Sequence, residues 1–208
     1  MSGGREQLGP YTYRWSPECF PLGGDSLALG EFATLRPGGR VLDLGCGAGL
    51  LLLLCARRCP DLELIGVELD PAAGELARQN LLENGLSGQI LLGDLRQLNL
   101  PGEMDLVISN PPWYPSGNLG GPARVEGGGF PQLCRAAAKS LKSKGRFALV
   151  HRPERLTDLL CALREAGLEP KRLRLCRGKP EKAPYAVLIE AVKAGRPGLE
   201  LLPDRIGT

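Results

Sequence analysis

Asn110 and the four residues that follow it carry the most specific chemistry in this chain. The stretch reads Asn110-Pro111-Pro112-Trp113-Tyr114 and comes directly after an apolar run, at the expected carboxyl end of a strand. Two consecutive prolines make a rigid, non-helical turn. Such a turn fixes an amide side chain and a backbone carbonyl beside a large aromatic ring. These groups suit the binding of a flat group that bears an NH2, so they predict chemistry on a planar amine or amide nitrogen.

A glycine-rich turn is the second motif with chemical content. The sequence VLDLGCGAG at 41–49 reads as a strand, a tight turn and the start of a helix. A dinucleotide fingerprint has the spacing G-x-G-x-x-G, whereas the third glycine here comes one residue early. Asp43 lies two residues before Gly45 and would repel a pyrophosphate, which binds at the positive end of a helix. A ligand with cationic ends would be attracted instead, and S-adenosylmethionine carries an ammonium and a sulfonium but no phosphate.

Two further acidic residues follow expected strands. Glu68 comes 25 residues after Asp43, and a carboxylate at that strand tip is placed to accept hydrogen bonds from both hydroxyls of a ribose. Asp94 follows the next strand, where it is expected to accept from an adenine amine while Leu95 lies against the ring. Each of these residues alone is equally well explained as a turn or cap residue. Their order along the chain, always at carboxyl ends of strands, favours a ligand site.

These motifs need a sheet that places them along one edge. The apolar pattern predicts strands that alternate with helices, and such alternation indicates right-handed crossovers and a mostly parallel sheet. The expected strands are 40–44, 62–68, 89–92, 104–109, 146–150, 173–176 and 186–192, and the expected helices are 25–35, 50–58, 71–84, 130–141 and 154–166. The predicted fold class is therefore α/β, with a single Rossmann-like, doubly wound, mostly parallel seven-stranded sheet and an antiparallel last strand.

Local signals place three of the helix ends. Asp25 and Ser26 can each cap a helix, because either side chain can accept from the N–H groups of the first turn. Asp70 followed by Pro71 is an N-cap with proline at the first helical position. Gly85 is expected to end that helix in the left-handed conformation.

The 208 residues suffice for one α/β domain with a sizeable core. No repeat or low-complexity linker divides the chain, so this domain is expected to span 25–193. Residues 1–24 are rich in proline, glycine and aromatics and are predicted to form an irregular N-terminal arm. Residues 194–208 form a C-terminal tail with no clear signal of structure.

The composition disfavours several classes of protein. Hydrophobic residues make up 43% and charged residues 24%, as in ordinary soluble proteins, and the net charge of +3 gives no strong polyanion signal. None of the seven cysteines forms a C-x-x-C pair, which favours reduced thiols in the cytoplasm over a disulfide framework or a zinc site. The apolar run at 50–54 is too short to span a membrane, and 1–5 lacks a secretory apolar region. We therefore expect a cytoplasmic protein without a metal site or membrane contact.

Taken together, VLDLGCGAG at 41–49, VELD at 67–70, GDL at 93–95 and NPPW at 110–113 resemble a class I S-adenosylmethionine-dependent methyltransferase that carries the N-P-P-[YFW] motif. The resemblance covers about 25–192. That group includes adenine-N6 methyltransferases of DNA and RNA and the glutamine methyltransferase of release factors.

Two flanking stretches are more similar to the bacterial valine-tRNA adenine-N6 methyltransferase family than to its siblings. They are GDSLAL at 24–29 and VHRPERL at 150–156. The chain departs from these relatives at 115–129, where it has a compact glycine-rich loop in place of a longer segment. The resemblance implies that this loop touches the substrate.

The resemblance also implies a role for each motif residue. The side-chain oxygen of Asn110 and the carbonyl of Pro111 would accept the two N–H bonds of the target, which frees the nitrogen lone pair for in-line attack on a methyl group. Pro112 keeps the catalytic turn rigid, and Trp113 would stack on the flat group, worth about 1–3 kcal/mol for a base on an aromatic ring. Tyr114 is either a second wall of the substrate pocket or a core contact. The residues that would hold S-adenosylmethionine are Asp43, Gly45, Cys46, Gly47, Gly49, Glu68, Leu69, Asp94, Leu95 and Asn110.

Basic residues after the fifth strand bear on the class of substrate. Arg152 and Arg155, with others at 171–182, form either a solvated face or a rim that contacts the phosphates of a nucleic acid. A phosphate-binding rim would make binding strongly dependent on salt. An adenine in an RNA loop is also easily splayed into a pocket. His151 is the lone histidine, and the implied mechanism needs no histidine base.

Three kinds of function remain open. The favoured one is methyl transfer from S-adenosylmethionine to N6 of adenine in tRNA, by a monomer or a small homo-oligomer. Transfer to adenine N6 of DNA or to glutamine N5 of a release factor is the enzymatic alternative, and the second needs a partner-docking domain for which the short N-terminal arm offers little room. A scaffold that binds the cofactor without catalysis is disfavoured, because Asn110 and both prolines are intact.

Overall fold

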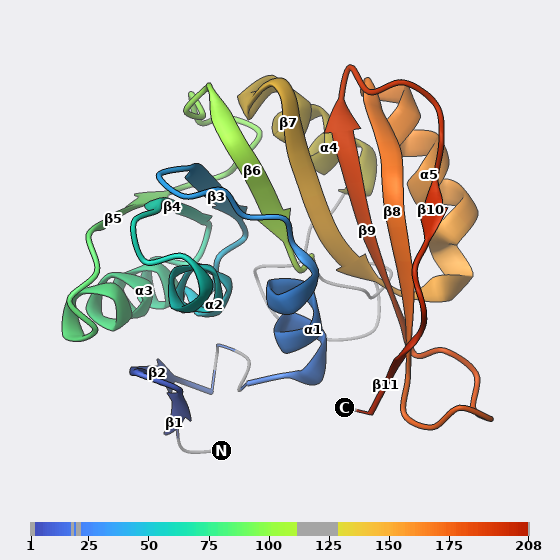
Figure 1. The fold of residues 1–208 in the computed structure, drawn as a ribbon. Helices are drawn as coiled ribbons and strands as arrows, with labels where there is room; N and C mark the ends of the chain where they lie inside the picture. The colour runs from blue at the N-terminus through green and yellow to red at the C-terminus, as the bar shows by residue number, and fades with distance from the viewer. Residues whose placement is uncertain (1–2, 18, 20–21, 112–128, 208) are drawn as a thin grey trace.

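A computed structural model describes residues 3–17, 19, 22–111 and 129–207 of the chain. Its body is a sheet with helices on both faces (Figure 1). The strands lie in the order β10-β8-β9-β7-β6-β3-β4-β5, and β11 also pairs with β8. Their bounds are β3 (Arg40–Leu44), β4 (Glu63–Glu68), β5 (Gly88–Leu92), β6 (Met104–Ser109), β7 (Leu141–His151), β8 (Leu168–Arg177), β9 (Ala186–Lys193), β10 (Glu200–Leu201) and β11 (Arg205–Ile206).

The sheet is parallel from β5 to β7, and β9 runs antiparallel to both of its neighbours, β7 and β8. The predicted fold class, a mostly parallel α/β sheet with an antiparallel last strand, is confirmed. The expected count of seven strands omits β10 and β11, two short strands in which the C-terminal tail pairs in parallel with the edge of β8. The tail is held because Leu202 donates its N–H to Leu173 and Arg177 forms an ion pair with Asp204.

Two hydrophobic cores form, one on each face of the sheet. Helices α1, α2 and α3 cover the first face, and α4 and α5 cover the second (Figure 1). The five-leucine run that begins α2 is buried throughout, because this helix is packed both on the sheet and against α1. The helix bounds are α1 (Gly24–Phe32), α2 (Leu50–Arg58), α3 (Pro71–Glu83), α4 (Gly129–Ser140) and α5 (Leu156–Glu165), with a 3-10 turn η1 (Pro153–Arg155) ahead of α5.

The predicted ends of α3 are confirmed. The side chain of Asp70 accepts from the N–H of Ala72 at 2.8 Å, and Pro71 occupies the first helical position. Gly85 adopts a left-handed φ of 67° just after the helix, where a residue with a Cβ would be strained.

The predicted cap of α1 is wrong. The N-cap is Gly23, which makes no side-chain hydrogen bond, so Asp25 and Ser26 lie inside the first turn. The helix also ends at Phe32, three residues before the expected end. The Ser26 hydroxyl is therefore available for a contact elsewhere, which proves to be with Asn110.

The N-terminal arm is a β-hairpin rather than the irregular segment that was expected. Strands β1 (Gly4–Leu8) and β2 (Tyr11–Trp15) pair in antiparallel fashion. The hairpin is held on α3 by Asn80 and Asn84, which lie one helical turn apart and bond the backbone of alternate β2 residues. Asn84 pairs with both the N–H and the carbonyl of Thr12 at 2.8 Å, and Asn80 does the same with Arg14 at 3.0 and 2.8 Å.

The carboxyl ends of β3, β4, β5 and β6 lie along one edge of the sheet because these strands are parallel. This carboxyl edge faces the hairpin and the start of α1 (Figure 1). Each of the chemical motifs found in the sequence follows one of these strand ends. Within the described ranges, no helix combines the length and the apolarity that crossing a membrane requires.

Candidate methyl-donor and catalytic site

The glycine turn after β3 is built for close approach of a ligand. Gly45, Gly47 and Gly49 have φ values of 78°, 53° and 81°, a region that favours glycine. A Cβ added at Gly45 or Gly47 would meet no atom of the described chain within 4 Å. The turn is anchored on the next strand, because the N–H groups of Gly45 and Cys46 both donate to the carbonyl of Val67 at 2.9 and 3.0 Å. The space beside the turn is therefore open while its backbone is fixed.

Asp43 is an unpaired carboxylate under this turn. Its side chain is fully buried, and neither carboxylate oxygen has a hydrogen-bond partner within the described chain. Burial, together with the charge of Glu68, raises the pKa of Asp43 well above its usual range. A buried carboxylate without partners is costly, so this one calls for a cationic or hydrogen-donating ligand.

Glu68, at the end of β4, is a second acidic group of this edge. Its carboxylate accepts from the N–H of Gly47 at 2.7 Å, which ties the glycine turn to β4, and from Leu69 and Asp70 at 2.8 and 2.9 Å. Each carboxylate oxygen has two acceptor positions, so Glu68 retains capacity for a ligand hydroxyl. Leu69 is 48% exposed beside it, an apolar surface at the same edge.

Asp94 lies past the end of β5 and is already engaged. It accepts from the backbone N–H and the guanidinium of Arg96, both at 2.9 Å, and these contacts lower its pKa. Gly93 donates to the carbonyl of Glu68 at 2.8 Å, so the tips of β4 and β5 are joined. Leu95 packs on the core of the α4 face. The structure thus places Asp94 at the same edge as Glu68, with Arg96 as its present partner.

Cys46 lies inside the glycine turn. Its side chain is 6% exposed, and burial with the charges of Asp43 and Glu68 raises the pKa of its thiol well above the usual range. The thiol is therefore neutral and acts as a small apolar contact. Gly66 is needed opposite, because a Cβ there would lie 2.7 Å from the Cys46 sulfur.

Asn110 is held in place from two directions. Its side-chain Nδ2 donates to the hydroxyl of Ser26 on α1 at 3.0 Å. The preceding residue, Ser109, is fully buried and donates its hydroxyl to the carbonyl of Leu44 at 2.7 Å, which locks the end of β6 to the end of β3. With Nδ2 engaged by Ser26, the amide oxygen of Asn110 is left to accept from a ligand. Pro111 is half-buried next to it.

The remaining members of the motif, Pro112, Trp113 and Tyr114, lie outside the described residues, as does most of the glycine-rich loop predicted at 115–129.

Arg152 and Arg155 lie beyond the carboxyl end of β7, the neighbour of β6. Both are exposed, and Arg155 forms an ion pair with Asp158 at 2.7 Å. His151 ends the same strand and is buried, which lowers its pKa, and its Nδ1 accepts from the N–H of Arg152 at 2.8 Å. Its ring meets Phe130, at the start of α4, edge to face. A histidine kept neutral by packing has a structural role here, and the implied mechanism needs no histidine base.

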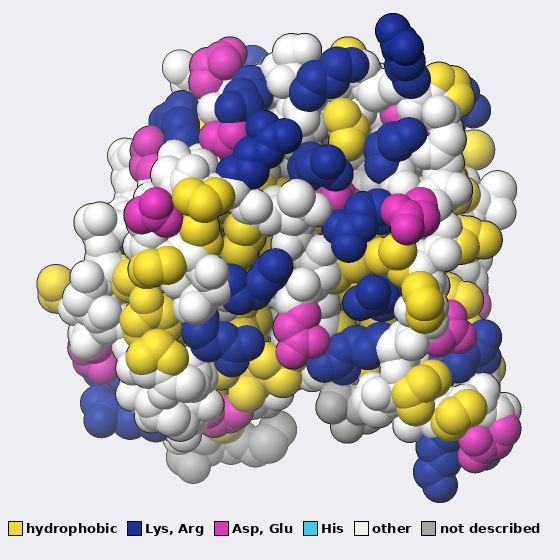
Figure 2. Space-filling model, in the orientation of Figure 1, with side chains coloured by type: hydrophobic (Ala, Val, Ile, Leu, Met, Phe, Trp, Pro, Cys, Tyr) yellow, Lys and Arg dark blue, Asp and Glu magenta, His cyan; other side chains and the backbone are white. Residues whose placement is uncertain are grey.

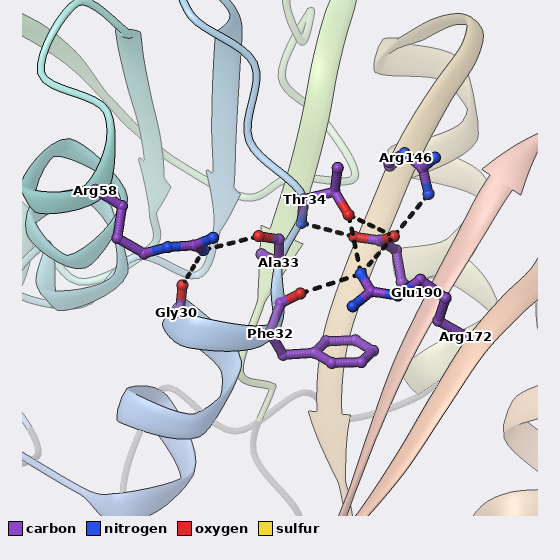
Figure 3. A network of polar contacts seen from close by, with 8 residues as sticks. All are labelled: Gly30, Phe32, Ala33, Thr34, Arg58, Arg146, Arg172 and Glu190. Atoms are coloured by element: carbon purple, nitrogen blue, oxygen red, sulfur yellow. Dashed lines mark hydrogen bonds and ion pairs between the residues drawn. The ribbon is translucent and has the colours of Figure 1, made fainter. Parts of the chain in front are cut away.

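Arg172, another basic residue of the expected rim, has a structural role. Arg172 donates to buried Glu190 at 3.2 Å and stacks over the ring of Phe32 at 4.7 Å. Arg146 donates to the same carboxylate at 2.7 Å, and the backbone N–H and hydroxyl of Thr34 complete the set at 2.8 and 2.9 Å (Figure 3). This group of charges, which we call the Glu190 cluster, fixes the segment that follows α1 to β7, β8 and β9.

Helix α1 is also held from its other side. Arg58, at the end of α2, donates to the carbonyls of Gly30 and Ala33 at 2.6 and 2.8 Å (Figure 3). A cation near the carbonyl end of a helix is favourable for the helix dipole as well. The C-terminal end of α1 is therefore held from two sides. These contacts fix the position of the helix whose Ser26 binds Asn110.

Sequence reasoning missed Ser26, Ser109 and Asn80 as parts of the site. Asn80 is fully buried and donates to the carbonyl of Ala48 in the glycine turn at 2.8 Å while it also binds the hairpin. A polar residue on the inward face of α3 was the available signal. Burial of Tyr13 on β2, which raises the pKa of its hydroxyl, shows that the hairpin packs closely here.

The described residues fit S-adenosylmethionine. The buried, unpaired Asp43 can take a positive charge, the open glycine turn admits the ligand backbone, and Glu68 has acceptor capacity for hydroxyls. Within the described ranges, no cluster of three or more His, Cys, Asp or Glu residues could hold a metal ion.

Comparison with known proteins identifies the family of the chain. The family described as "Methyltransferase small domain" matches residues 24–162. A curated relative from Porphyromonas gingivalis, named tRNA1(Val) (adenine(37)-N6)-methyltransferase, is 33% identical in an alignment 187 residues long that covers 81% of this chain and 73% of the relative.

Two solved structures extend the comparison. A predicted O-methyltransferase from Agrobacterium tumefaciens has a TM-score of 0.72 at 25% identity, covering 88% of this chain and 86% of that one. The 16S rRNA N2 G1207 methyltransferase of Thermus thermophilus, solved with AdoMet and guanosine, has a TM-score of 0.68 at 25% identity and covers 92% of this chain and 50% of that one.

Proposed function

This chain belongs to the methyltransferase small domain family, and from that premise we propose that it transfers the methyl group of S-adenosylmethionine to N6 of adenine in tRNA. The observation that carries the proposal is the orientation of Asn110, whose Nδ2 is taken by Ser26 so that its oxygen can accept from an amine. Support for the substrate comes from the Porphyromonas gingivalis relative, whose name specifies adenine N6 of a tRNA.

The cofactor side of the reaction rests on the carboxyl edge. When bound, S-adenosylmethionine supplies an activated methyl group. Asp43 would bind its positive charge, and Glu68 its ribose hydroxyls, while Gly45 and Gly47 let the ligand approach the backbone. Asp94 reaches an adenine amine only if it shares its carboxylate with Arg96. Leu69 and Leu95 then add apolar contact, and Cys46 a neutral wall.

The substrate side rests on the turn after β6. An exocyclic amine of adenine is a poor nucleophile because its lone pair is delocalised into the ring. The oxygen of Asn110 and the carbonyl of Pro111 would accept its two N–H bonds and orient the lone pair toward the methyl group. Preorganised acceptors of this kind contribute through orientation and electrostatics. Trp113 and Tyr114 would stack on or flank the base.

Arg152 and Arg155 would contact phosphates of the RNA. They lie at the carboxyl end of β7, next to the strand that carries Asn110, and both are exposed. Figure 2 shows one face of the molecule, on which Lys and Arg side chains are interspersed with Asp and Glu. That face carries both signs of charge, and Arg152 and Arg155 are the members of the expected rim that we retain for RNA binding.

The proposal is tested with labelled S-adenosylmethionine and three acceptors in parallel: unmodified tRNA, double-stranded DNA and a release factor. Label in tRNA that is recovered as N6-methyladenosine is the expected result. Label confined to protein glutamine, or to DNA, would overturn the assignment of substrate while leaving the enzyme class intact.

A further inference from the structure

A basic groove runs along the α4 side of the molecule and adjoins the site described above, with which it shares Leu95 and Arg96. It has a volume of about 380 Å³ and lies between α4 and the connection that leads from β5 to β6. The connection supplies Leu95, Leu98 and Leu100 as an apolar wall, and α4 supplies the opposite side. We call it the α4 groove.

The charge of the α4 groove has one sign. Arg96, Arg135 and Lys139 line it, and no acidic residue does. Arg135 and Lys139 lie one turn apart on α4, are exposed, and have no hydrogen-bond or ion-pair partner in the part of the chain that the structure describes. Arg96 is paired with Asp94. The groove therefore presents at least two uncommitted positive charges, unlike the mixed face of Figure 2.

Gln132 adds a polar group with unmet hydrogen-bonding capacity. It lines the groove from the first turn of α4, and its Oε1 is buried with no partner within the described chain. A buried amide oxygen without a donor is unfavourable. A ribose 2′-hydroxyl or a base amine would supply that donor, and only RNA carries the 2′-hydroxyl.

Both walls of the groove begin at the carboxyl edge. Leu95 and Arg96 directly follow Asp94 at the tip of β5, and Gln132 lies in the first turn of the helix that follows the catalytic segment. Lys139 lies at the far end of α4, toward the amino ends of the strands. A strand whose target base is at Asn110 can therefore leave the catalytic site along this groove.

We propose that the α4 groove binds a single-stranded segment of the RNA substrate that flanks the target base, an inference that rests on the proposed function. Arg135 and Lys139 bind its phosphates, the leucine wall takes the face of a base, and Gln132 accepts from a ribose hydroxyl. A positively charged groove that follows the backbone is the usual feature of proteins that bind single-stranded nucleic acid, and in this groove leucines supply the surface for a base.

The test compares two double variants, each of which loses two positive charges. Arg135→Ala/Lys139→Ala removes the groove cations, and Arg36→Ala/Arg196→Ala removes two exposed arginines that precede β3 and follow β9, at the edge of the sheet opposite the carboxyl edge. Affinity for unmodified tRNA is measured at several salt concentrations. The groove variant is expected to bind roughly tenfold more weakly, and its salt slope to fall by about 1.4, because each phosphate of a single strand contributes about 0.7. The arginine control should change both values much less.

Affinity for S-adenosylmethionine, expected to be unchanged in both variants, establishes that each one is folded. Wild-type tRNA affinity and salt slope in the groove variant would overturn the inference, as would an equal or larger loss in the arginine control. Gln132→Leu sharpens the result, since it should weaken RNA but not a DNA strand of the same sequence.

The outcomes separate this inference from the proposed function. If the wild type methylates tRNA adenine but the groove variant binds tRNA normally, the groove proposal alone fails. If the groove variant loses RNA binding but the wild type transfers no label to adenine, the proposed function alone fails.

Discussion

Asp43 and Glu190 are two carboxylates with equal burial and opposite surroundings. Both are fully buried in the described structure. Glu190 accepts from Thr34, Arg146 and Arg172, whereas neither oxygen of Asp43 has a partner within the described chain. Since a buried charge is tolerated only when it is paired, the fold explains the satisfied group, and we propose a ligand as the partner of the unsatisfied one. The comparison thus distinguishes a carboxylate with a structural role from one proposed to bind a ligand, without reference to any sequence motif.

Helix α1 links these two regions. The Glu190 cluster and Arg58 hold its C-terminal end, and Ser26 near its N-terminal end holds the amide of Asn110. A substitution in the Glu190 cluster should therefore shift α1 and so change the position of Asn110. Loss of the Asp43 carboxylate should change only the affinity for the cofactor.

Glu190→Ala should give the largest loss of stability. It leaves the positive charges of Arg146 and Arg172 without their shared partner, and breaking a buried ion pair costs about 3–5 kcal/mol. Denaturant unfolding measures the change, with Glu190→Gln as a milder control of the same shape. Unfolding free energy equal to the wild type in Glu190→Ala would contradict the structural role.

Asp43→Asn should reduce cofactor affinity without reducing stability. Removing an unpaired buried charge should leave thermal stability unchanged or higher, while affinity for S-adenosylmethionine falls by at least about 30-fold, or ~2 kcal/mol. Calorimetric titration and a melting curve of the same preparation give both values. A variant that melts earlier yet binds the cofactor normally would make Asp43 a structural residue like Glu190.

The pH dependence sharpens the difference between the two acids. Because the pKa of Asp43 is raised in the ligand-free protein, it takes up a proton as pH falls toward that pKa. Cofactor affinity should then weaken by up to about tenfold per pH unit below it, and this dependence should vanish in Asp43→Asn. The sign for stability is reversed: a raised folded-state pKa makes the ligand-free wild type lose stability as pH rises through it. Affinity that strengthens toward acid pH would contradict this account.

Ser26→Ala tests the link through α1 and has the smallest expected effect. Loss of the contact with Asn110 should lower kcat about fivefold, or ~1 kcal/mol, because the amide is no longer held in one orientation. Cofactor affinity and stability should remain close to wild type, and Ser26→Thr should restore most of the rate. Equal rates in the Ala and Thr variants, whether both high or both low, would remove Ser26 from the positioning role.

Features that depend on local signals could be predicted from the sequence, whereas features that depend on tertiary contacts could not. The cap of Asp70, the turn at Gly85 and the strand tips at Asp43 and Glu68 depend on neighbouring residues, so they were predictable. The hairpin was not, because its position depends on the amides of α3 that bond its backbone.

The sequence singled out the acidic and glycine residues that the structure gathers at the carboxyl edge, but not the residues that support them. Serine is a common N-cap residue, so Ser26 was predicted as a cap. Only the fold shows that Gly23 occupies the N-cap position while Ser26 accepts a hydrogen bond from Asn110. Glu190 offered a signal, since it is a lone charge in the apolar run of β9, but its partners come from three distant segments. Spacing along the chain cannot reveal such partners.

The most direct test of the central claim is nucleoside analysis of unmodified tRNA after incubation with S-adenosylmethionine and either wild type or Asn110→Ala. The account predicts N6-methyladenosine with the wild type and a loss of at least about 100-fold in rate with the variant, whose cofactor affinity stays within a few-fold. Undiminished methylation by Asn110→Ala, or loss of cofactor binding in place of loss of transfer, would contradict the role of this turn.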